Sequence, residues 1–367
     1  MAIREDIVEL SKALIAFPST AKDDVAKDEC LDYIVSYMRQ RDPTIECVFY
    51  SFFNTSLNKK VKNLHIYRKN ISGSRILLLG HIDVVEAKND QFSPSIAEDH
   101  LYGRGSGDMK GSVCVALHLL LQNPTKNIHV IITGDEEVGG SGGAKELSKI
   151  LDFDFCITLE PTDMLIRSRE KGGLWVDACA RSSGGHASTP WVETGAIEKL
   201  MDFYDRCKFY FPIPEKSTWV NTLSVGGIYG GLLENNVPGP ANKISSSAIM
   251  RLDIRYVSSK EEVLTLLRSL SQDVEIKDPV VHMKKLETNE QNPFVQTLLN
   301  CVRKRKGNQE QLTFGNSTSD TRFFSSIPCV VFGPICKGMH ADDERVSISS
   351  LVFVYNVIND FLVVIDE

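Results

Sequence analysis

Histidines and acidic residues follow several apolar segments of this 367-residue sequence, in a pattern that could bind metal. His81 and Asp83 come after R-I-L-L-L-G, three consecutive acids come after I-H-V-I-I-T, and Glu160 ends F-C-I-T-L-E. Asp108 and His340 add another carboxylate and a second imidazole. Adjacent carboxylates raise one another's pKa unless positive charge holds them together. Two cations would supply that charge, and these ligand types suit zinc or another divalent transition metal.

Each motif alone has a simpler explanation. A His-x-Asp at a strand end often makes a local hydrogen bond, and an acidic cluster after a strand often forms a solvated turn or a helix N-cap. Here, however, the motifs concentrate in short turns after apolar strands, and strand ends are where an α/β sheet keeps its site. Their concentration therefore favours one joint site.

Two glycine-rich segments suggest other chemistries. G-R-G-S-G-D-M-K-G lacks the G-x-G-x-x-G spacing and the terminal G-K-[ST] of a phosphate loop, so it does not predict nucleotide binding. Gly139 to Gly143 satisfies G-x-S-x-G, but a nucleophile elbow needs its serine at the strand-to-helix turn itself, and D-E-E-V intervenes. Ser141 is therefore expected to be a loop or capping residue, and a serine hydrolase stays as a rival hypothesis.

Composition limits the class of protein. The net charge of -7 argues against a nucleic-acid footprint or a polybasic membrane surface, so small molecules are the expected partners. No stretch reaches the roughly 18 apolar residues of a membrane span, and the N-terminus lacks an apolar signal region. The nine cysteines are scattered without a C-x-x-C pair, which favours reduced thiols. We therefore expect a cytoplasmic protein.

Apolar periodicity predicts an α/β protein in the first part of the chain. The strands before His81, before the acids and around Ile157 are continuously apolar, as in a largely parallel sheet with both faces covered by helices. The predicted strands cover residues 47–52, 63–67, 75–80, 129–134 and 155–160, and the predicted helices residues 3–15, 25–38, 111–122 and 143–151.

The pattern changes after residue 166. Strands at 174–181, 222–229, 243–256 and near 274, with helices at 190–210 and 260–270, follow the β-α-β-β-α-β order of a split βαβ, ferredoxin-like module. A helix over 294–305, the strand P-C-V-V-F-G and a terminal helix from 349 then resume the first domain. We predict a catalytic domain of residues 1–166 and 285–367 with an inserted α+β domain of residues 167–284.

Together these motifs resemble one enzyme family. L-L-L-G-H-I-D-V-V, L-Y-G-R-G-S-G-D-M-K-G, T-G-D-E-E-V-G-G, I-T-L-E-P, G-G-H-A-S-T-P, N-N-V-P-G, T-S-D-T-R-F-F and G-P-I-C-K-G-M-H-A-D-D-E-R-V-S-I occur in this order. The sequence is similar over nearly its whole length to the two-metal amidohydrolases that include acetylornithine deacetylase, succinyl-diaminopimelate desuccinylase, aminoacylase and glutamate carboxypeptidase. The joint pattern is specific for the superfamily but not for the substrate.

The resemblance implies a centre of two zinc ions per subunit, with cobalt or manganese as substitutes. It implies that His81 and Glu160 bind one ion, that Glu137 and His340 bind the other, and that Asp108 bridges both. Asp83 would orient His81 through the ring N–H. Glu136, which binds no ion in this arrangement, would be the general base.

The resemblance also implies residues that contact substrate. His186 of the inserted domain matches an oxyanion-stabilising histidine that reaches the site of the partner subunit, so the inserted domain would act in dimerisation and as a lid. Without the family, His186 would be expected to pair locally. The other positions implied to contact substrate are Asn235, Asn236, Arg255, Ser319 and Arg322. The asparagine pair could instead form a turn, and each arginine a surface ion pair.

The substrate cues conflict. Desuccinylases usually carry a second basic residue where this chain has Glu170 before Lys171, and an acid there suits a dicarboxylate acyl group poorly, whereas T-S-D-T-R-F-F is desuccinylase-like. We expect a dimeric, zinc-dependent deacylase of a simple N-acyl amino acid. A di- or tripeptidase with the same site is the main alternative, and a non-catalytic metal-dependent binding protein is a remote one.

Overall fold

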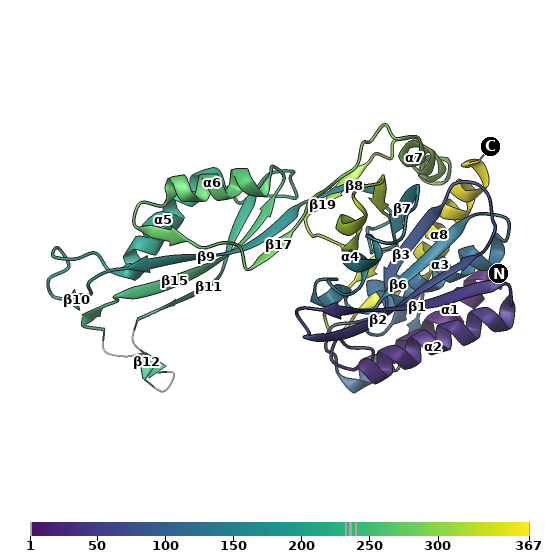
Figure 1. Ribbon diagram of the computed structural model, residues 1–367, viewed down its shortest axis with the longest axis horizontal. Coiled ribbons are helices and arrows are strands. Elements are labelled where there is room, and N and C mark those ends of the chain that lie inside the picture. The colour runs from purple at the N-terminus through teal and green to yellow at the C-terminus, as the bar shows by residue number, and fades with distance from the viewer. Residues whose placement is uncertain (1, 232, 235–236, 239–240, 367) are drawn as a thin grey trace. The chain divides into compact units, whose positions relative to one another are not determined.

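The computed structural model describes residues 2–231, 233–234, 237–238 and 241–366, and the chain forms two compact units (Figure 1). Unit 1 comprises Met1–Arg169, Leu286–Phe314 and Ser319–Glu367, and unit 2 comprises Glu170–Lys285 and Gly315–Thr318. Each unit has its own hydrophobic core.

Unit 1 is built on a mixed sheet in the order β1-β2-β6-β3-β7-β20-β8-β18, with β19 paired to β8. Its central strands β6, β3, β7 and β20 are parallel, while β1, β2 and β8 pair antiparallel with their neighbours. This confirms the predicted α/β class with a mostly parallel central sheet. The strands are β1 (Ile45–Asn54), β2 (Lys59–Arg68), β3 (Ile76–His81), β6 (Ile128–Thr133), β7 (Phe155–Thr158), β8 (Arg167–Glu170), β18 (Leu286–Glu287), β19 (Thr313–Gly315) and β20 (Cys329–Val331).

Helices cover both faces of this sheet. Successive side chains of a strand point to opposite faces, so each central strand contributes to the packing on both sides. Ile76 and Leu78 of β3 pack in the core with α1, α2, α3, α7 and α8, whereas Leu77 and Leu79 pack with α4 and the 3-10 turn η4. This explains the continuous apolar runs of the central strands. The helical elements are α1 (Ala2–Ile15), α2 (Asp24–Arg41), η1 (Asn89–Phe92), η2 (Ser106–Lys110), α3 (Gly111–Gln122), η3 (Glu136–Val138), α4 (Ala144–Leu147), α7 (Pro293–Lys306), η4 (Asp320–Phe324) and α8 (Ile348–Val364).

Unit 1 also contains a second, smaller sheet, whose connecting segments lie near the carboxyl ends of the central strands. Its order is β21-β22-β5-β4, and all its pairs are antiparallel. It consists of β4 (Ser95–Ala97), β5 (His100–Tyr102), β21 (Cys336–Lys337) and β22 (Arg345–Ser347).

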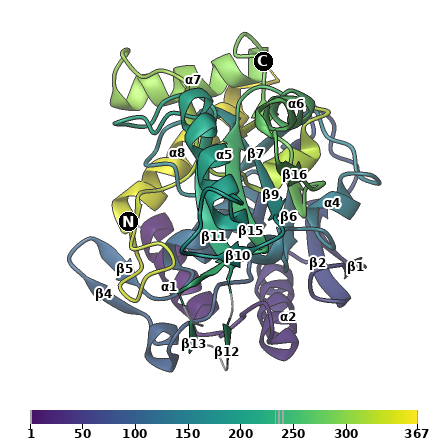
Figure 2. The ribbon, with the colours of Figure 1, turned by 90° about the vertical axis from the view of Figure 1, so that its left-hand side faces the viewer.

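Unit 2 is an antiparallel sheet in the order β11-β15-β9-β16, with β17 also paired to β9. With its two helices this is the predicted split βαβ arrangement. Figure 1 and Figure 2 show α5 and α6 on the same face of the sheet, where Leu174, Leu252 and Phe203 share one core. The elements are β9 (Gly172–Arg181), β10 (Gly185–His186), α5 (Ala196–Tyr210), β11 (Thr222–Gly230), β12 (Leu233–Glu234), β13 (Val237–Pro238), β14 (Lys243–Ile244), β15 (Ser247–Tyr256), α6 (Lys260–Leu270), β16 (Val274–Ile276) and β17 (Val281–Met283).

Several predicted elements differ in extent; β1 and β2, for example, are longer than the strands expected over 47–52 and 63–67. The helix expected from residue 190 begins at Ala196 after an extended Gly195, because residues 189 to 192 form turns and Ala196 N donates to Ser245 O. The helix expected over 143–151 is regular only over Ala144–Leu147, beyond which some bonds tighten to the i→i+3 pattern. The strand expected over 243–256 is divided into β14 and β15.

Among the described residues, none of the helices is both long and apolar enough to cross a bilayer.

Candidate metal centre

Three adjacent parallel strands end at the same edge of the unit 1 sheet and deliver most of the predicted ligands. His81 is the last residue of β3, Glu136 and Glu137 follow β6, and Glu160 lies two residues beyond β7. Since β3 pairs with both β6 and β7 in parallel, the carboxyl ends of the three strands meet there.

The remaining two predicted ligands come from the small sheet. Asp108 lies in η2 after β5, and His340 lies in the loop between β21 and β22. Antiparallel pairing of β5 with β22 brings these two segments together although 232 residues separate them in sequence. Gly107 permits the approach, because a Cβ at this position would lie 2.2 Å from Cys336 Sγ.

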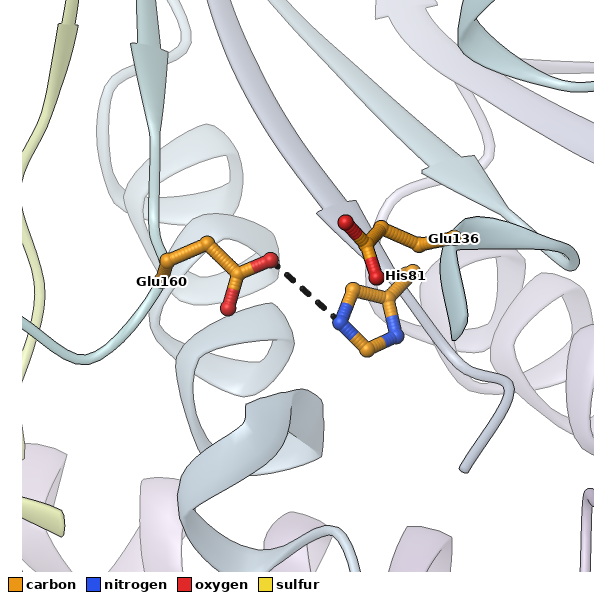
Figure 3. Close-up of side chains that lie close together, drawn as sticks. All are labelled: His81, Glu136 and Glu160. Carbon is orange, nitrogen blue, oxygen red and sulfur yellow. Dashed lines mark ion pairs between the residues drawn. The ribbon is translucent and has the colours of Figure 1, made fainter. Parts of the chain in front are cut away.

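The five predicted ligands and the predicted base Glu136 form two groups, and Asp108 of one group also contacts His81 of the other. His81, Glu136 and Glu160 form one group, shown in Figure 3, and Asp108, Glu137 and His340 form the other; within each, candidate ligand atoms lie within 4.8 Å of one another. Asp108 Oδ1 is 3.2 Å from His81 Nε2, and Asp108 Oδ2 is 3.1 Å from His340 Nε2. His81 Nε2 lies 3.4 Å from Glu160 Oε1, and His340 Nε2 lies 3.2 Å from Glu137 Oε1.

The three consecutive acids of G-D-E-E-V-G-G point into different surroundings. Asp135 is fully buried away from the two groups, and its Oδ2 accepts hydrogen bonds from Asn54 Nδ2 at 2.6 Å and Gly142 N at 2.7 Å. Glu136 faces His81 and Glu160 (Figure 3), whereas Glu137 joins His340. The turn therefore separates one structural acid from two that face the centre.

Asp83 holds this turn in place. Its two carboxylate oxygens accept the backbone N–H groups of Glu136 at 3.1 Å and Glu137 at 3.0 Å. The His81 ring contacts the same residue differently from the expectation: Nδ1 is 2.9 Å from the main-chain oxygen of Asp83 and 3.6 Å from its carboxylate. Donation from Nδ1 to that carbonyl would leave Nε2 with a lone pair facing Asp108 and Glu160.

Without cations, the imidazoles are the positive charges of this cluster. Burial raises the pKa of Asp108, but hydrogen bonds from His340 and His81 outweigh burial and hold the pKa well below its usual range. Hydrogen bonds to Asp108 and Glu137 raise the pKa of His340 to about 10. Burial lowers the pKa of His81, yet its contacts with Asp108 and Glu160 raise that pKa overall.

Two imidazoles do not neutralise all the carboxylates. Burial raises the pKa of Glu160 to about 8 and that of Asp83 to about 7. The pKa of Glu136 is raised well above its usual value by burial and then by the charges of Asp320 and Glu160. Divalent cations would replace the imidazole protons and keep these acids ionised, so the donor set fits a pair of metal ions.

Two further predicted residues of unit 1, Ser319 and Arg322, are buried. Ser319 Oγ is 2.6 Å from Thr321 Oγ1, which donates to Thr158 Oγ1 at 2.7 Å. Arg322 is 5% exposed and donates to the backbone oxygens of Ser319 at 2.7 Å and Gly139 at 3.0 Å. The side chains of Ser319 and Arg322 therefore form hydrogen bonds within the protein.

The remaining predicted residues belong to unit 2. His186 of β10 is exposed, and its Nδ1 accepts the backbone N–H of Ser188 at 3.1 Å, so the neutral ring carries its proton on Nε2. Arg255 forms a two-pronged ion pair with Asp253 at 2.8 and 2.9 Å. Asn235 and Asn236 lie outside the described residues.

Ser141 makes loop contacts. Its Oγ accepts the backbone N–H of Thr55 at 3.2 Å and lies 3.4 Å from Thr55 Oγ1. This position favours the loop role expected for Ser141 over that of a nucleophile.

The nine cysteines are all free thiols, as the scattered spacing predicted.

Sequence reasoning missed three buried charged residues beside the centre. Asp320 is buried and raises the pKa of Glu136, and Arg104 and Glu344 form a buried ion pair next to η2. Arg104 and Glu344 stand inside the two segments that supply Asp108 and His340, which was the available signal. Their pairing across 240 positions has no local sequence signature.

Comparison with known proteins identifies relatives along the chain. Residues 77–363 match Peptidase family M20/M25/M40. The succinyl-diaminopimelate desuccinylase of Pelagibacter ubique (strain HTCC1062) is 28% identical over 392 residues, with 97% of each chain covered. The desuccinylase of Helicobacter pylori (strain HPAG1) is 28% identical over 408 residues, with 99% of each chain covered.

Solved structures share the fold. A tripeptidase from Staphylococcus aureus subsp. aureus Mu50 has a TM-score of 0.77 at 17% identity, over 99% of this chain and 98% of the other. The aminoacylhistidine dipeptidase of Vibrio alginolyticus has a TM-score of 0.67 at 14% identity, over 99% and 97% of the two chains. The family match extends from the strand that ends in His81 to the last helix and includes every residue of the two groups. The chain therefore belongs to Peptidase family M20/M25/M40 and is a hydrolase that acts on amide bonds.

Proposed function

We propose that this hydrolase removes the acyl group from an N-acyl amino acid, using two zinc ions per subunit, with cobalt or manganese as functional substitutes. The observation that carries the proposal is the position of Asp108, whose two oxygens face His81 and His340 while Glu136 stands beside the same cluster. We assign His81 and Glu160 to one ion, Glu137 and His340 to the other, and Asp108 to both.

Glu136 is the general base in this proposal. When bound, the two cations polarise the amide carbonyl and make water a nucleophile near neutral pH. The Glu136 carboxylate accepts the proton of that water and later transfers it to the leaving amine. Asp83 sets the position of Glu136 by accepting its backbone N–H, and the same carboxylate fixes Glu137.

His186 supplies a hydrogen-bond donor to the developing oxyanion in this proposal. Acceptance of the Ser188 N–H at Nδ1 leaves the ring proton on Nε2, which is the state needed for donation. By its resemblance to the family, His186 would act in the site of the partner subunit, so we propose a homodimer in which the inserted domain serves dimerisation and acts as a lid. The domain limits of 167 and 284 and a cytoplasmic location belong to the same proposal.

The substrate class is proposed from the names of the relatives. The desuccinylases named above act on an acylated amino acid by their printed names, which favours deacylation over peptide cleavage. Asn235, Asn236 and Arg255 stay predicted substrate contacts. The buried contacts of Ser319 and Arg322 favour a role in shaping the site rather than in binding substrate directly.

A substrate panel tests the proposal. Purified protein is stripped of metal, reloaded with zinc, and assayed with N-acetyl amino acids, N-succinyl amino acids, and dipeptides and tripeptides with a free amine. We expect zinc-dependent release of the amino acid from at least one acylated series. The acetyl and succinyl arms distinguish the two acyl classes.

Other outcomes of the panel identify the alternatives. Cleavage of only the free-amine peptides would contradict deacylation and indicate a di- or tripeptidase. Activity that survives chelation and disappears in Ser141→Ala would indicate a serine hydrolase. Zinc binding without hydrolysis across the panel would point to a metal-dependent binding protein.

A further inference from the structure

We infer that the buried Arg104–Glu344 pair is a positioning device that links Asp108 and His340 and so sets the affinity of the metal centre. This inference rests on the proposed metal centre. Neither residue is among the proposed ligands, and both are only 2% exposed.

Glu344 holds the backbone that presents Asp108. Its Oε1 accepts the N–H of Gly107 at 3.1 Å and the N–H of Asp108 at 3.2 Å. A carboxylate that accepts two adjacent backbone donors fixes the peptide plane before Asp108 and hence the direction of the Asp108 side chain. The other oxygen, Oε2, binds Arg104 Nη1.

Arg104 connects the same carboxylate to the His340 loop. Its Nη2 donates to Ala341 O at 3.2 Å, directly after His340 in the chain. One guanidinium therefore contacts both the Glu344 side chain and the backbone of the loop that carries the second imidazole. The backbone pairing of β5 with β22 continues one step to the Gly103 N–Glu344 O bond of 3.1 Å, which keeps Arg104 beside Glu344.

The His340 loop needs such support. His340 has a φ of 62°, in the left-handed region that residues other than glycine adopt only with backbone strain. Gln91 Nε2 also holds the loop, donating to Ala341 O at 3.3 Å and Asp342 O at 3.0 Å. Without these donors the strained residue would be free to relax and withdraw its imidazole from Asp108.

The pair thus acts on two ligands through their backbones rather than on a metal ion. Residues that orient ligands in this way typically change metal affinity by about 10- to 100-fold when they are replaced. Because Arg104 reaches the loop of His340, the ion assigned to Glu137 and His340 should be affected more than the ion assigned to His81 and Glu160.

Glu344→Gln tests the inference. The glutamine oxygen can still accept the two backbone N–H groups, but the variant loses the ion pair with Arg104. Zinc is titrated into metal-free protein and followed by calorimetry, beside wild type and His340→Ala. We expect Glu344→Gln to bind one ion about 10- to 100-fold more weakly, with an isotherm that approaches that of His340→Ala.

Asp42→Asn is the matched control, because it breaks another largely buried pair, Arg68–Asp42, in the same unit. It should lower the melting temperature of metal-free protein while leaving the zinc isotherm unchanged. If Glu344→Gln is folded and binds both ions as wild type does, the inference is wrong. Failure of the wild type to bind two ions would instead refute the proposed metal centre.

A second variant covers the case in which Glu344→Gln does not fold. Arg104→Lys keeps the charge for Glu344 but lacks the planar fork that also reaches Ala341. We expect the same selective weakening of one ion. Wild-type zinc binding by folded Arg104→Lys would contradict the link to the His340 loop.

Discussion

At the scale of single residues, the centre concentrates more acid than its own cationic groups can balance. His81 and His340 share Asp108, but Glu136 and Glu160 retain raised pKa values because they are mostly removed from solvent and lie next to other carboxylates. Bound cations would ionise both acids and would leave Glu136 as a base held by its neighbour Asp83. The bound cations would therefore also convert Glu136 to the carboxylate form that a general base needs.

Replacing Glu136 by glutamine should separate catalysis from metal binding. We expect kcat to fall by about 10²- to 10⁴-fold, because the amide cannot accept a proton, while two zinc ions still bind. Steady-state kinetics and metal analysis of the purified variant measure both quantities. Glu146→Gln, which changes a surface glutamate paired with Lys149, is the control and should keep wild-type turnover. Full activity of Glu136→Gln would remove this residue from the mechanism.

Zinc binding should release protons and weaken as the pH falls from 8 to 6. The pKa of His340 is raised to about 10 in the metal-free protein, so the ring is protonated at neutral pH, whereas a ligand imidazole must be neutral. Calorimetry in buffers of different ionisation enthalpy counts the released protons. His340→Ala should release fewer. Binding without proton release, or with an affinity independent of pH, would contradict the charge state described for His340.

At the scale of elements, the site depends on how short turns leave the parallel strands. The turn after β6 ends in two glycines with positive φ, Gly139 at 96° and Gly140 at 64°. A Cβ on Gly140 would lie 2.1 Å from Asp320 Oδ1, whereas a Cβ on Gly139 would meet nothing within 4 Å. A side chain at Gly139 would therefore suffer only from the positive φ, whereas a side chain at Gly140 would also clash with Asp320.

Alanine substitutions at these glycines should differ in their effect on stability. Gly139→Ala should lower the free energy of unfolding by about 1 kcal/mol through its positive φ alone. Gly140→Ala should lose about 1–3 kcal/mol more, because Asp320 and its neighbours must move. Denaturant unfolding of the two metal-free variants measures the difference. Equal losses would show that the contact with Asp320 is relieved without cost.

The apolar runs were sufficient to predict the central strands, since a strand buried on both faces has no polar alternation to confuse its pattern. The positions of His81, of Glu136 and Glu137, and of Glu160 followed from where those runs ended, whereas the assignment of Asp108 and His340 rested on the resemblance to the family. The start of α5 was predicted too early because Thr189 and Pro190 suit a turn as well as a helix start. Arg104 and Glu344 could not be paired from sequence, because their contact depends on β5 meeting β22 from distant parts of the chain.

At the scale of the whole molecule, the two units present different kinds of surface. Unit 1 encloses its sheet between helices, whereas the described part of unit 2 has helices on one face of its sheet only. Its other face carries Trp175, Ile249 and the Arg251–Asp177 and Arg255–Asp253 ion pairs. An antiparallel sheet tolerates such a solvated face, whereas a parallel sheet does not.

Removing zinc should destabilise the fold, and more so at pH 8.5 than at pH 7. Folding raises the pKa of Glu160 from 4.5 to about 8 and that of His340 from 6.5 to about 10. The stability that each contributes without metal is therefore complete below its unfolded pKa and is lost as pH rises through its folded pKa. Zinc replaces the protons, so its stabilising effect should grow over this interval.

Scanning calorimetry with zinc and with chelator at both pH values measures this effect. The comparison at one pH cancels groups outside the centre, such as Lys110, whose pKa burial lowers to about 8. The difference in melting temperature between zinc and chelator should be larger at pH 8.5. A difference that shrinks with pH would mean that protons do not compete with the ions.

Each of the three consecutive acids Asp135, Glu136 and Glu137 has a different partner, so the length of this turn is fixed. Asp135 faces Asn54, Glu136 faces His81 and Glu137 faces His340, and Asp83 binds the backbone of the last two. Inserting or deleting one amino acid between Thr133 and Gly139 would shift every acid into its neighbour's place. Length variation in this enzyme should therefore be confined to loops elsewhere, even where the composition of this segment could vary.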